Sequence, residues 1–400
     1  MSPSALQVRL HFSIEDTPVV GTLSQIHRTS VFQYDRGFLA RGLPFSPFHL
    51  PPLVTVQAYD GKGGMETFGV FEDALPDGWG RRIIDTHFRN LYNRLPTLLE
   101  RFPLVGEGGM GALTFHPVEP LSSATAPVAL SELAENAWAF DDSQVADVLP
   151  ELRRIAGSSG GARPKAYIGF NPQTGAVCAH AEILPEDHEH WIVKFNTRAD
   201  GIYAGALEYA YSTLARQADA NVSPCWLIET KAGRFFATQR FDRRPSGRRL
   251  HLHSAAGLLH ANFRIPGDEY EILFRLTDAL IRDYAAKKEL FRRVCLNVLL
   301  HNRDDHLKNF AYLMNADGEW SLAPFYDFTP ANGPNGWHTL SIAGEGEHPR
   351  ENDLLRLADS VSLETSDAKA IIEKTQTVCA TFSSLAKDLG IPASVCKNEA

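Results

Sequence analysis

The chain changes character along its 400 residues, and this change constrains the fold more than any single motif does. The first 115 residues read as short strands and turns, punctuated by Gly, Asp and Pro. Strand candidates are 6–12, which alternates apolar and polar residues, 19–23 and 32–39. From about residue 268 onward, apolar residues recur at helical spacing instead. A strand-rich part followed by a helix-rich part predicts an α+β protein with two lobes, between which a ligand would bind.

Charge and cysteine content argue against several classes of protein. Lys and Arg number 39 against 48 Asp and Glu, a net charge of −9, which disfavours non-specific binding of nucleic acid by the whole molecule. The five cysteines are scattered without a Cys-x-x-Cys pair, which argues against a disulfide framework and fits a reducing cytoplasm. No stretch approaches the ~18 apolar residues of a membrane span, and no secretory signal is recognisable. We therefore expect a cytoplasmic protein without a membrane partner.

The most informative segment is 297–310, in which a hydrophobic helix ends in a dense polar loop. Asp304 and Asn309 lie five residues apart in this loop, and Asp327 follows eighteen residues after Asn309. This order is what phosphoryl transfer from Mg-ATP requires, because one carboxylate orients and deprotonates the attacking hydroxyl while an amide and a second carboxylate hold magnesium. The alternative is a solvated polar loop in which Asp304 and Asp305 merely cap the next element.

Lys194 favours the phosphoryl-transfer interpretation. It lies inside an apolar strand, where a lysine costs free energy unless its ammonium reaches an anion such as an ATP phosphate. The alternative is an edge-strand lysine whose side chain reaches water. Glu208, on the following helix, could pair with Lys194 or could be a surface residue of an amphipathic helix.

Two glycine-rich stretches invite a nucleotide-loop interpretation. In 157–165, small residues would let backbone amides approach phosphate oxygens, and Lys165 adds a positive charge, although this is not a Walker A sequence. Alone, it would be a flexible turn. The stretch 106–111 contains Gly-x-Gly-x-x-Gly without a βαβ context, so we expect only a sharp connection before a strand at 112–115.

Taken in order, these motifs resemble those of the HipA family of serine/threonine kinases, which are toxins of bacterial toxin–antitoxin pairs. The similarity is carried by 158–165 (Ser-Ser-Gly-Gly-Ala-Arg-Pro-Lys), 192–194 (Ile-Val-Lys), 239–243 (Gln-Arg-Phe-Asp-Arg), 302–310 (Asn-Arg-Asp-Asp-His-Leu-Lys-Asn-Phe), 326–327 (Tyr-Asp) and 75–79 (Leu-Pro-Asp-Gly-Trp). It covers most of the chain. It implies a two-lobed, kinase-like α+β fold with a β-rich N-terminal subdomain and a helical C-terminal lobe.

The same resemblance implies four segments. Residues 1–115 would form the β-rich N-terminal subdomain, and 116–145 a linker and connecting helix. Residues 146–245 would form the ATP-binding kinase N-lobe with its glycine-rich loop, and 246–400 the helical C-lobe with the catalytic loop. The many Pro, Ser, Thr and Ala residues of 116–130 fit a linker.

Roles for individual residues also follow from the resemblance. Asp304 would be the catalytic base, and Asn309 and Asp327 the magnesium ligands. His306 and Lys308 would shape the catalytic loop and neutralise charge. The residues expected to bind ATP are Ser158, Ser159, Gly160, Gly161, Ala162, Lys165, Lys194, Gln239 and Phe241.

Two positions within this ATP-binding set carry a further expectation. The family's regulatory serine lies seven residues before the loop lysine, which is Ser158 here, and the adjacent Ser159 is the alternative site of autophosphorylation. Gln239 and Phe241 would lie at the adenine hinge. The family often has Glu where this chain has Gln239, so hydrogen bonding at the hinge would differ.

Two further patterns carry weaker signals. The run 240–249 contains five arginines, which would contact operator DNA or an acidic partner, or form a solvated hairpin face. His251 and His253 lie on one face of an extended segment, as a metal-binding pair would, although two histidines without a third ligand are more often structural.

We therefore expect an ATP- and Mg²⁺-dependent serine/threonine protein kinase that phosphorylates a cytosolic protein, and itself on the glycine-rich loop. Family targets include aminoacyl-tRNA synthetases of the translation machinery. The implied partners are a helix-turn-helix antitoxin and, through it, operator DNA. Two alternatives remain: a catalytically silent, nucleotide-binding regulator or antitoxin-partner module with the same fold, and a metal-dependent phosphohydrolase using His301, Asp304, Asp305 and His306.

Overall fold

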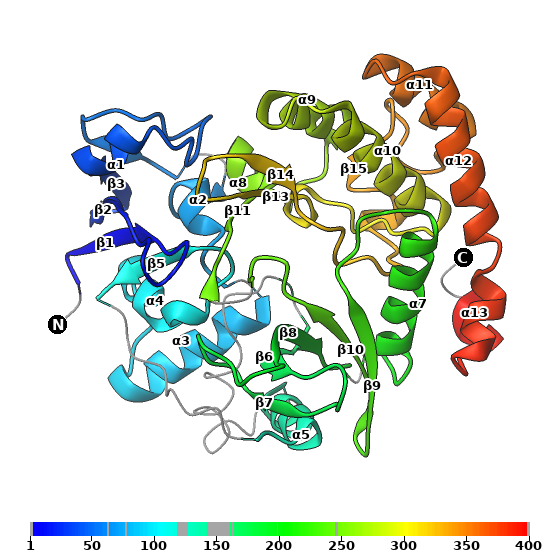
Figure 1. The fold of residues 1–400 in the computed structure, drawn as a ribbon, viewed down its shortest axis with the longest axis horizontal. Helices are drawn as coiled ribbons and strands as arrows, with labels where there is room; N and C mark the ends of the chain where they lie inside the picture. Colours follow the sequence, from blue (N-terminus) through cyan, green and yellow to red (C-terminus); the bar gives the residue numbers. More distant parts are fainter. Residues whose placement is uncertain are drawn as a thin grey trace.

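The computed structural model describes residues 3–61, 64–76, 78–117, 127–141, 161, 163–197, 199–244 and 247–397. Ser158, Ser159, Gly160 and Ala162 of the expected phosphate loop lie outside the described residues. The ribbon shows the N-terminal strands at one end of the molecule and the C-terminal helices at the other, with a second group of strands between them (Figure 1). No helix in the described ranges is long and apolar enough to cross a membrane.

The N-terminal unit is built on a five-stranded antiparallel sheet with the strand order β4-β3-β2-β1-β5. The strands are β1 (Ala5–Leu10), β2 (Val19–Ile26), β3 (Thr29–Tyr34), β4 (Gln57–Tyr59) and β5 (Leu113–His116). The helices of this unit are α1 (Arg36–Arg41), α2 (Gly69–Glu72), α3 (Gly78–Tyr92), α4 (Leu98–Val105) and the 3-10 turn η2 (Gly106–Gly108). The alternating pattern at the start of the chain buries Leu6, Val8 and Leu10 on one face of the sheet.

The strand expected at 32–39 ends early. The strand β3 stops at Tyr34, and Asp35 begins helix α1, because its carboxylate accepts hydrogen bonds from the amides of Gly37 (2.8 Å) and Phe38 (3.2 Å). Aspartate is a favoured N-cap residue for this reason. The expected strand was therefore wrong over its second half.

A second five-stranded antiparallel sheet has the order β7-β6-β8-β10-β9. Its strands are β6 (Lys165–Phe170), β7 (Val177–Ala179), β8 (Glu189–Lys194), β9 (Cys225–Thr230) and β10 (Gly233–Gln239). Helices α5 (Leu130–Asp141) and α7 (Ala204–Gln217) accompany it. Leu133 of α5 and Trp79 of α3 belong to the same buried cluster as Val193 and Phe235 of the sheet, so the N-terminal unit contributes to the core of this sheet.

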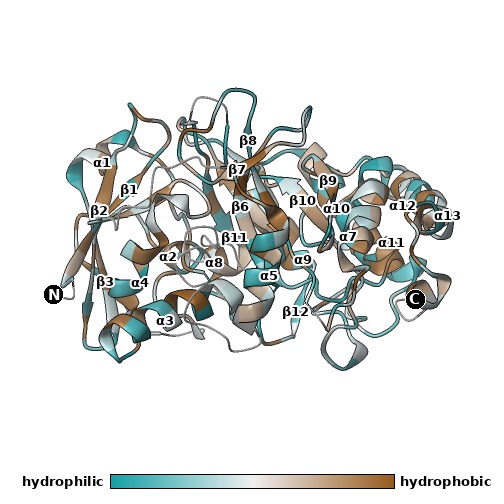
Figure 2. Ribbon diagram, turned by 90° about the horizontal axis from the view of Figure 1, so that it is seen from below, coloured by the Kyte–Doolittle hydropathy of each residue, from teal (hydrophilic) through white to brown (hydrophobic). Residues whose placement is uncertain are grey.

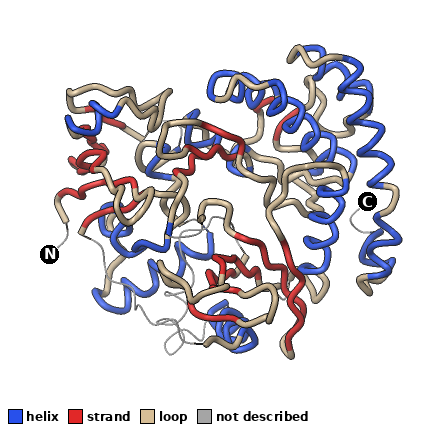
Figure 3. Tube along the Cα trace, in the orientation of Figure 1, coloured by secondary structure: helices blue, strands red, loops and turns tan. Residues whose placement is uncertain are grey.

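The C-terminal lobe is mainly helical. Its helices are α8 (Ala255–Leu259), α9 (Glu271–Leu280), α10 (Tyr284–Leu299), α11 (Glu351–Ser360), α12 (Thr365–Cys379), α13 (Phe382–Asp388) and α14 (Ala393–Lys397), with 3-10 turns η4 (Leu307–Asn309) and η5 (Pro334–Gly336). Small sheets pair β11 (His251–Ser254), β13 (Ala311–Met314) and β14 (Trp320–Leu322), and β12 (Asp268–Glu269) with β15 (Leu340–Ser341). Figure 3 shows how strongly helices predominate on this side of the molecule.

One hydrophobic core joins the two ends of the chain. It runs from the N-terminal sheet through α8 to the helices α9 to α12. Hydrophobic and hydrophilic stretches alternate along the outer helices α11 to α13 (Figure 2), as expected for helices that bury one face. The N-terminal unit and the C-terminal lobe therefore share a core, and the second sheet packs beside them.

Candidate active site

A cavity of about 390 Å³ lies between the second sheet, the C-terminal lobe and the N-terminal unit. This volume is within the range of small-molecule and cofactor sites. All ten of the predicted site residues that the structure describes line it: Gly161, Lys165, Lys194, Gln239, Phe241, Asp304, His306, Lys308, Asn309 and Asp327. The N-terminal unit contributes Asp73, Leu75, Gly78 and Met110, which sequence reasoning did not assign to the site. Leu75 and Gly78 belong to the 75–79 motif that carried the family resemblance, whereas nothing in the local sequence marks Asp73 or Met110, which the docking of distant segments places there.

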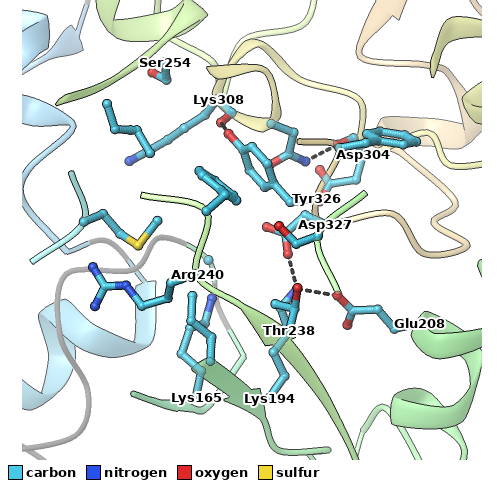
Figure 4. Close-up of a pocket in the computed structure, with 18 of the residues that line it drawn as sticks. Lys165, Lys194, Glu208, Thr238, Arg240, Ser254, Asp304, Lys308, Tyr326 and Asp327 are labelled. Atoms are coloured by element: carbon cyan, nitrogen blue, oxygen red, sulfur yellow. Dashed lines mark hydrogen bonds and ion pairs between the residues drawn. The ribbon is translucent and has the colours of Figure 1, made fainter. Parts of the chain in front are cut away.

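The Lys194 side chain, on strand β8, contacts carboxylates from two other segments that line the cavity. Its Nζ lies 2.5 Å from Oε1 of Glu208 on α7 and also pairs with Asp327 (Figure 4). Burial lowers the pKa of Lys194, but the two carboxylates outweigh burial and raise this pKa above its ordinary value. The strand β8 lies between β6 and β10, and the lysine side chain is only 13% exposed. The interpretation of Lys194 as an edge-strand lysine that reaches water was therefore wrong.

Asp327 is held in the ionised state. Burial raises the pKa of its carboxyl, but the ammonium groups of Lys194 and Lys165 outweigh burial and hold this pKa well below its usual range. The backbone of Asp327 has a φ of 51°, a left-handed conformation that aspartate tolerates better than most residues. An ionised carboxylate is thus presented to the cavity.

Asp304 and Asn309 are joined within the loop after α10. The side-chain amide of Asn309 donates to the backbone carbonyl of Asp304 at 2.7 Å, and Nε2 of His306 lies 3.7 Å from Oδ1 of Asp304. The Asp304 side chain is 63% exposed, so its carboxylate is open to solvent. Partial desolvation raises the pKa of Asp304, and the nearby Asp327 and Asp305 add to this rise, while His306 opposes it.

Asp305 points away from the cavity and anchors the loop. Its buried carboxylate accepts hydrogen bonds from the hydroxyl of Tyr270 (2.6 Å), Nδ1 of His338 (2.7 Å) and the amide of Thr339 (2.7 Å). The interpretation of Asp304 and Asp305 as a pair of local caps was therefore wrong, because the two side chains face different surroundings. The partners of Asp305 lie more than thirty residues away in the chain, so no local pattern could have revealed them.

The four residues of the phosphohydrolase alternative do not converge. His301 is exposed, and neither it nor Asp305 lines the cavity that contains Asp304 and His306. Within the described ranges, no group of three or more His, Cys, Asp or Glu side chains is placed to hold a metal ion. The arrangement therefore gives that alternative no geometric support.

His306 and Lys308 both contact Phe263. The His306 ring lies 5.0 Å from the Phe263 ring, and Nζ of Lys308 lies 5.2 Å from the centre of that ring. Figure 4 shows the Lys308 side chain directed away from Asp304. Its backbone carbonyl accepts a hydrogen bond from the hydroxyl of Tyr326 at 2.8 Å. The Lys308 ammonium therefore lies against Phe263 and is turned away from the Asp304 carboxylate.

The described part of the expected phosphate loop approaches the same cavity. Lys165 is buried and faces Lys194 directly as a cross-strand pair between β6 and β8. Gly161 has a φ of 98°, and a Cβ there would lie 2.8 Å from Nζ of Lys165. Any larger residue at this position would therefore crowd the lysine ammonium.

The segment expected at the adenine hinge also borders the cavity. The backbone amide of Gln239, the last residue of β10, donates to the carbonyl of Pro224 at 2.9 Å. The ring of Phe241 lies 5.5 Å from that of Tyr326, which precedes Asp327. Aromatic side chains of Phe241 and Tyr326 thus line the cavity together with its charged residues.

Comparison with known proteins identifies the family. A family model described as the HipA-like C-terminal domain matches residues 157–382, and a model of the HipA N-terminal domain matches residues 13–116. This chain belongs to the HipA family. The resemblance inferred from the sequence motifs is therefore confirmed.

A solved HipA structure shows the same fold. It comes from a complex of HipA, HipB and operator DNA of the Shewanella oneidensis MR-1 toxin–antitoxin system, and it matches with a TM-score of 0.70 at 19% identity. The match covers 96% of this chain and 90% of that chain. The expected α+β, two-lobed, kinase-like fold of HipA type, with its β-rich N-terminal subdomain and helical C-terminal lobe, is confirmed.

Two curated relatives carry kinase names. "Putative kinase Y4dM" of Sinorhizobium fredii is 24% identical over 275 residues, which cover 64% of this chain and 60% of that protein. "Putative kinase" of Haemophilus influenzae is 26% identical over 102 residues, which cover 23% of this chain and 30% of that protein. The matches thus span less than two thirds of the length of either relative.

Two arginines of the run 240–249 in this HipA-family chain, Arg240 and Arg243, form a buried cluster with Asp242. Arg240 donates to Oδ1 (3.0 Å) and Oδ2 (2.7 Å) of Asp242, and Arg243 donates to Oδ2 at 2.6 Å. Both guanidinium groups also donate to backbone carbonyls of the glycine-rich stretch 108–111, at 2.7–3.1 Å. The solvated-face and DNA-contact interpretations were therefore wrong for these two residues, which instead join β10 to the N-terminal unit.

The histidines of β11 are structural. Both are fully buried. Nε2 of His251 contacts the carbonyl of Phe45 at 3.1 Å, and His253 contacts Asp73 at 2.7 Å through Nδ1 and Ser46 at 3.1 Å through Nε2. Burial lowers the pKa of His251 to about 3, so this ring is neutral at physiological pH. The HipA-family chain therefore uses this pair to pack its N-terminal unit against β11.

Proposed function

We propose that this protein is an ATP- and Mg²⁺-dependent serine/threonine protein kinase of the HipA toxin type. The observation that carries the proposal is the convergence of Lys194, Asp304, Asn309 and Asp327, which come from three distant parts of the chain, on one cavity. A chance Asp-x-x-x-x-Asn motif would not bring the strand lysine and the downstream carboxylate to the same place.

The residues present fit a nucleoside triphosphate. Lys165 and Lys194 are directly opposed on neighbouring strands, an arrangement that is destabilising for like charges unless an anion lies between them. The carboxylate of Asp327 supplies part of the negative charge that the two lysines need, and the phosphates of ATP would supply more. Ile192, Phe236 and Phe325 supply the apolar lining that an adenine ring requires.

The residues also fit magnesium. Mg²⁺ prefers oxygen ligands, and Asp327 offers an ionised carboxylate. The amide nitrogen of Asn309 is committed to the carbonyl of Asp304, which leaves the amide oxygen as its free ligand atom. When bound there, Mg²⁺ would neutralise the charge of the phosphates.

The protein's own residues account for the rest of the reaction. The hydroxyl oxygen of a serine or threonine attacks the γ-phosphorus, the bond to the β–γ bridging oxygen breaks, and ADP leaves. Asp304 accepts the hydroxyl proton, which its exposed position allows. His306, 3.7 Å away, would favour the ionised form of Asp304 when the imidazole is protonated. Lys194, fixed by Glu208, would hold the phosphates.

The biological setting is also part of the proposal. We propose a cytoplasmic toxin whose substrate belongs to the translation machinery, such as an aminoacyl-tRNA synthetase, and which phosphorylates itself at Ser158 or Ser159. Its partner would be a helix-turn-helix antitoxin that links it to operator DNA. The solved relative, which is described in complex with HipB and operator DNA, supports this setting.

The test is incubation of the protein with γ-labelled ATP and Mg²⁺, with and without a candidate substrate protein. Labelled protein in the wild type but not in Asp304→Asn would support the kinase. Release of free phosphate without labelled protein would favour a hydrolase. Nucleotide binding with neither product would favour the catalytically silent regulator.

A further inference from the structure

The N-terminal unit approaches the C-terminal lobe closely where α2 packs against α8. Neither Gly69 of α2 nor Gly257 of α8 has room for a side chain. A Cβ on Gly69 would overlap the backbone of Gly257, and a Cβ on Gly257 would overlap the carboxylate of Asp73. Asp73, the residue after α2, is thereby pressed against the first turn of α8.

The Asp73 carboxylate is an ionised hydrogen-bond acceptor inside this contact. It accepts from Nδ1 of His253 (2.7 Å), from the amide of Ser254 (2.7 Å) and from the hydroxyl of Ser254 (2.6 Å). The side chain is 5% exposed. Burial raises the pKa of Asp73, but its interactions with His253, Lys308 and Ser254 outweigh burial and lower this pKa below its ordinary value.

Ser254 transmits this contact to the start of α8. Its hydroxyl donates to Asp73 and accepts from the amide of Gly257 at 3.0 Å, so it caps the helix. A carboxylate of the N-terminal unit thus fixes the orientation of a helix cap in the C-terminal lobe.

The first turn of α8 is in turn bonded to the catalytic loop. The amide of Ala255 donates to the carbonyl of Phe310 at 2.7 Å, and Phe310 follows Asn309 directly. The side-chain amide of Asn309 donates to the backbone carbonyl of Asp304 at 2.7 Å. A short series of hydrogen bonds therefore leads from Asp73 to the backbone of the proposed base.

Lys308 adds an electrostatic contribution on the same side. Its ammonium is directed away from Asp304 (Figure 4), and its charge acts on Asp73. An apolar residue could fill the α2–α8 contact without the cost of burying a charge, so a buried carboxylate is weak evidence for stability alone. A fixed negative charge suits the positioning of a loop better.

We propose that Asp73 is a positioning residue for phosphoryl transfer, which fixes the catalytic loop from the N-terminal unit through Ser254, Ala255 and Phe310. The inference rests on the proposed kinase function. It makes the N-terminal unit part of the catalytic machinery and not only a surface for partners. A displacement of the catalytic loop by about 1 Å is enough to lower a rate by roughly a hundredfold.

The test compares Asp73→Asn with Asp85→Asn. Asparagine keeps the size of Asp73 but has one acceptor oxygen and no charge, so one donor of Ser254 or His253 loses its partner. Asp85 is the matched control, because it is a carboxylate of the same unit that pairs with Arg101 at 2.9 Å and does not line the cavity. We expect kcat of Asp73→Asn to fall about tenfold or more, with KM for ATP within about twofold of wild type. The control should keep both values within about twofold.

Hydrogen exchange gives a second readout that needs no activity. Backbone amides of 303–312 should exchange faster in Asp73→Asn than in wild type, at a temperature where all three proteins are folded. In Asp85→Asn, the same amides should exchange at the wild-type rate. If Asp73→Asn does not fold, Ser254→Ala interrupts the same series of hydrogen bonds and should give both effects. Wild-type kcat in the folded variant, or an equal loss in the control, would overturn the inference. Exchange at 303–312 that stays at the wild-type rate would also overturn it. A wild type that transfers no phosphate would instead refute the kinase proposal, while the exchange result would still stand.

Discussion

Lys194 of β8 and Asp327 of the C-terminal lobe form an ion pair across the cavity between the lobes. The same ammonium contacts Glu208 of α7, so one lysine joins three segments of the chain. In the proposed reaction, Asp327 would also hold a cation and Lys194 would hold phosphates. The contacts of both residues therefore have to rearrange when nucleotide binds, and nucleotide binding should be sensitive to either residue.

Replacing Lys194 should lower both activity and stability. In Lys194→Met, the carboxylates of Glu208 and Asp327 lose their cation. Since Asp327 is partly exposed, we expect a loss of about 1–3 kcal/mol in the free energy of unfolding at pH 7. Phosphate transfer should fall at least about a hundredfold. The control is Lys374→Met, which breaks an exposed pair with Asp219 and should cost at most about 0.5 kcal/mol.

The same variant carries a prediction about pH. The folded-state pKa of Asp327 lies below its ordinary value, so its contribution to stability is complete above the unfolded pKa of about 3.9 and is lost as the pH falls below it. The difference in unfolding free energy between wild type and Lys194→Met should therefore shrink between about pH 5 and pH 3. Urea unfolding across this range measures it, and a difference independent of pH would contradict the assignment.

Two aspartates of the site should fail in different ways. Asp327→Ala and Asp304→Ala should each abolish phosphate transfer while leaving the fold largely intact. Only Asp327→Ala should weaken Mg²⁺-dependent ATP binding, because Asp304 acts on the acceptor hydroxyl and not on the cation. Calorimetric titration with Mg-ATP measures the difference. Full transfer activity in either variant would refute the kinase proposal.

Toxicity should depend on catalysis. Expression of the wild type in bacteria without a partner protein should slow growth, and Asp304→Ala should restore it, because this change removes the proposed base while altering a single side chain. Growth curves at matched protein levels provide the measurement. Equal toxicity of the two proteins would indicate that binding, and not phosphorylation, arrests growth.

Phosphorylation of the glycine-rich loop should switch the enzyme off. A phosphoserine at Ser158 or Ser159 carries about −1.5 to −2 charge, which would repel the triphosphate of ATP. Intact-mass and peptide mapping after incubation with Mg-ATP should find phosphate there in the wild type and not in Asp304→Ala. Unchanged ATP affinity in both Ser158→Asp and Ser159→Asp would exclude the switch.

The sequence predicted the core of the site because its residues lie in short motifs. Asp304 and Asn309 share one loop, and their spacing pointed to their relationship once Asp327 and Lys194 were found in the expected order. The role of Asp305 was different, since its partners Tyr270 and His338 are remote in sequence and converge only in the folded chain. In the sequence, an aspartate outside any periodic pattern looks the same whether its side chain faces a cavity or a buried hydrogen-bond network.

Other predictions failed where a single residue overrode a sequence pattern or a residue's usual preference. The strand expected at 32–39 alternated well, but the capping ability of Asp35 ended it, which a period of two does not reveal. The sequence favoured an exposed position for Arg240 and Arg243 because arginine is usually exposed. Asp242, lying between Arg240 and Arg243, compensates their burial together with the carbonyls of a distant glycine stretch.

The arginine cluster has a consequence for how the molecule can be divided. Arg240 and Arg243 leave the end of β10 and place their guanidinium groups on carbonyls of residues 108–111, which precede the linker. A fragment that begins after the linker would carry both guanidinium groups on a newly exposed surface, with Asp242 as their remaining partner in the cluster. The second sheet and the N-terminal unit should accordingly melt in one transition, and neither half should behave as a transferable module.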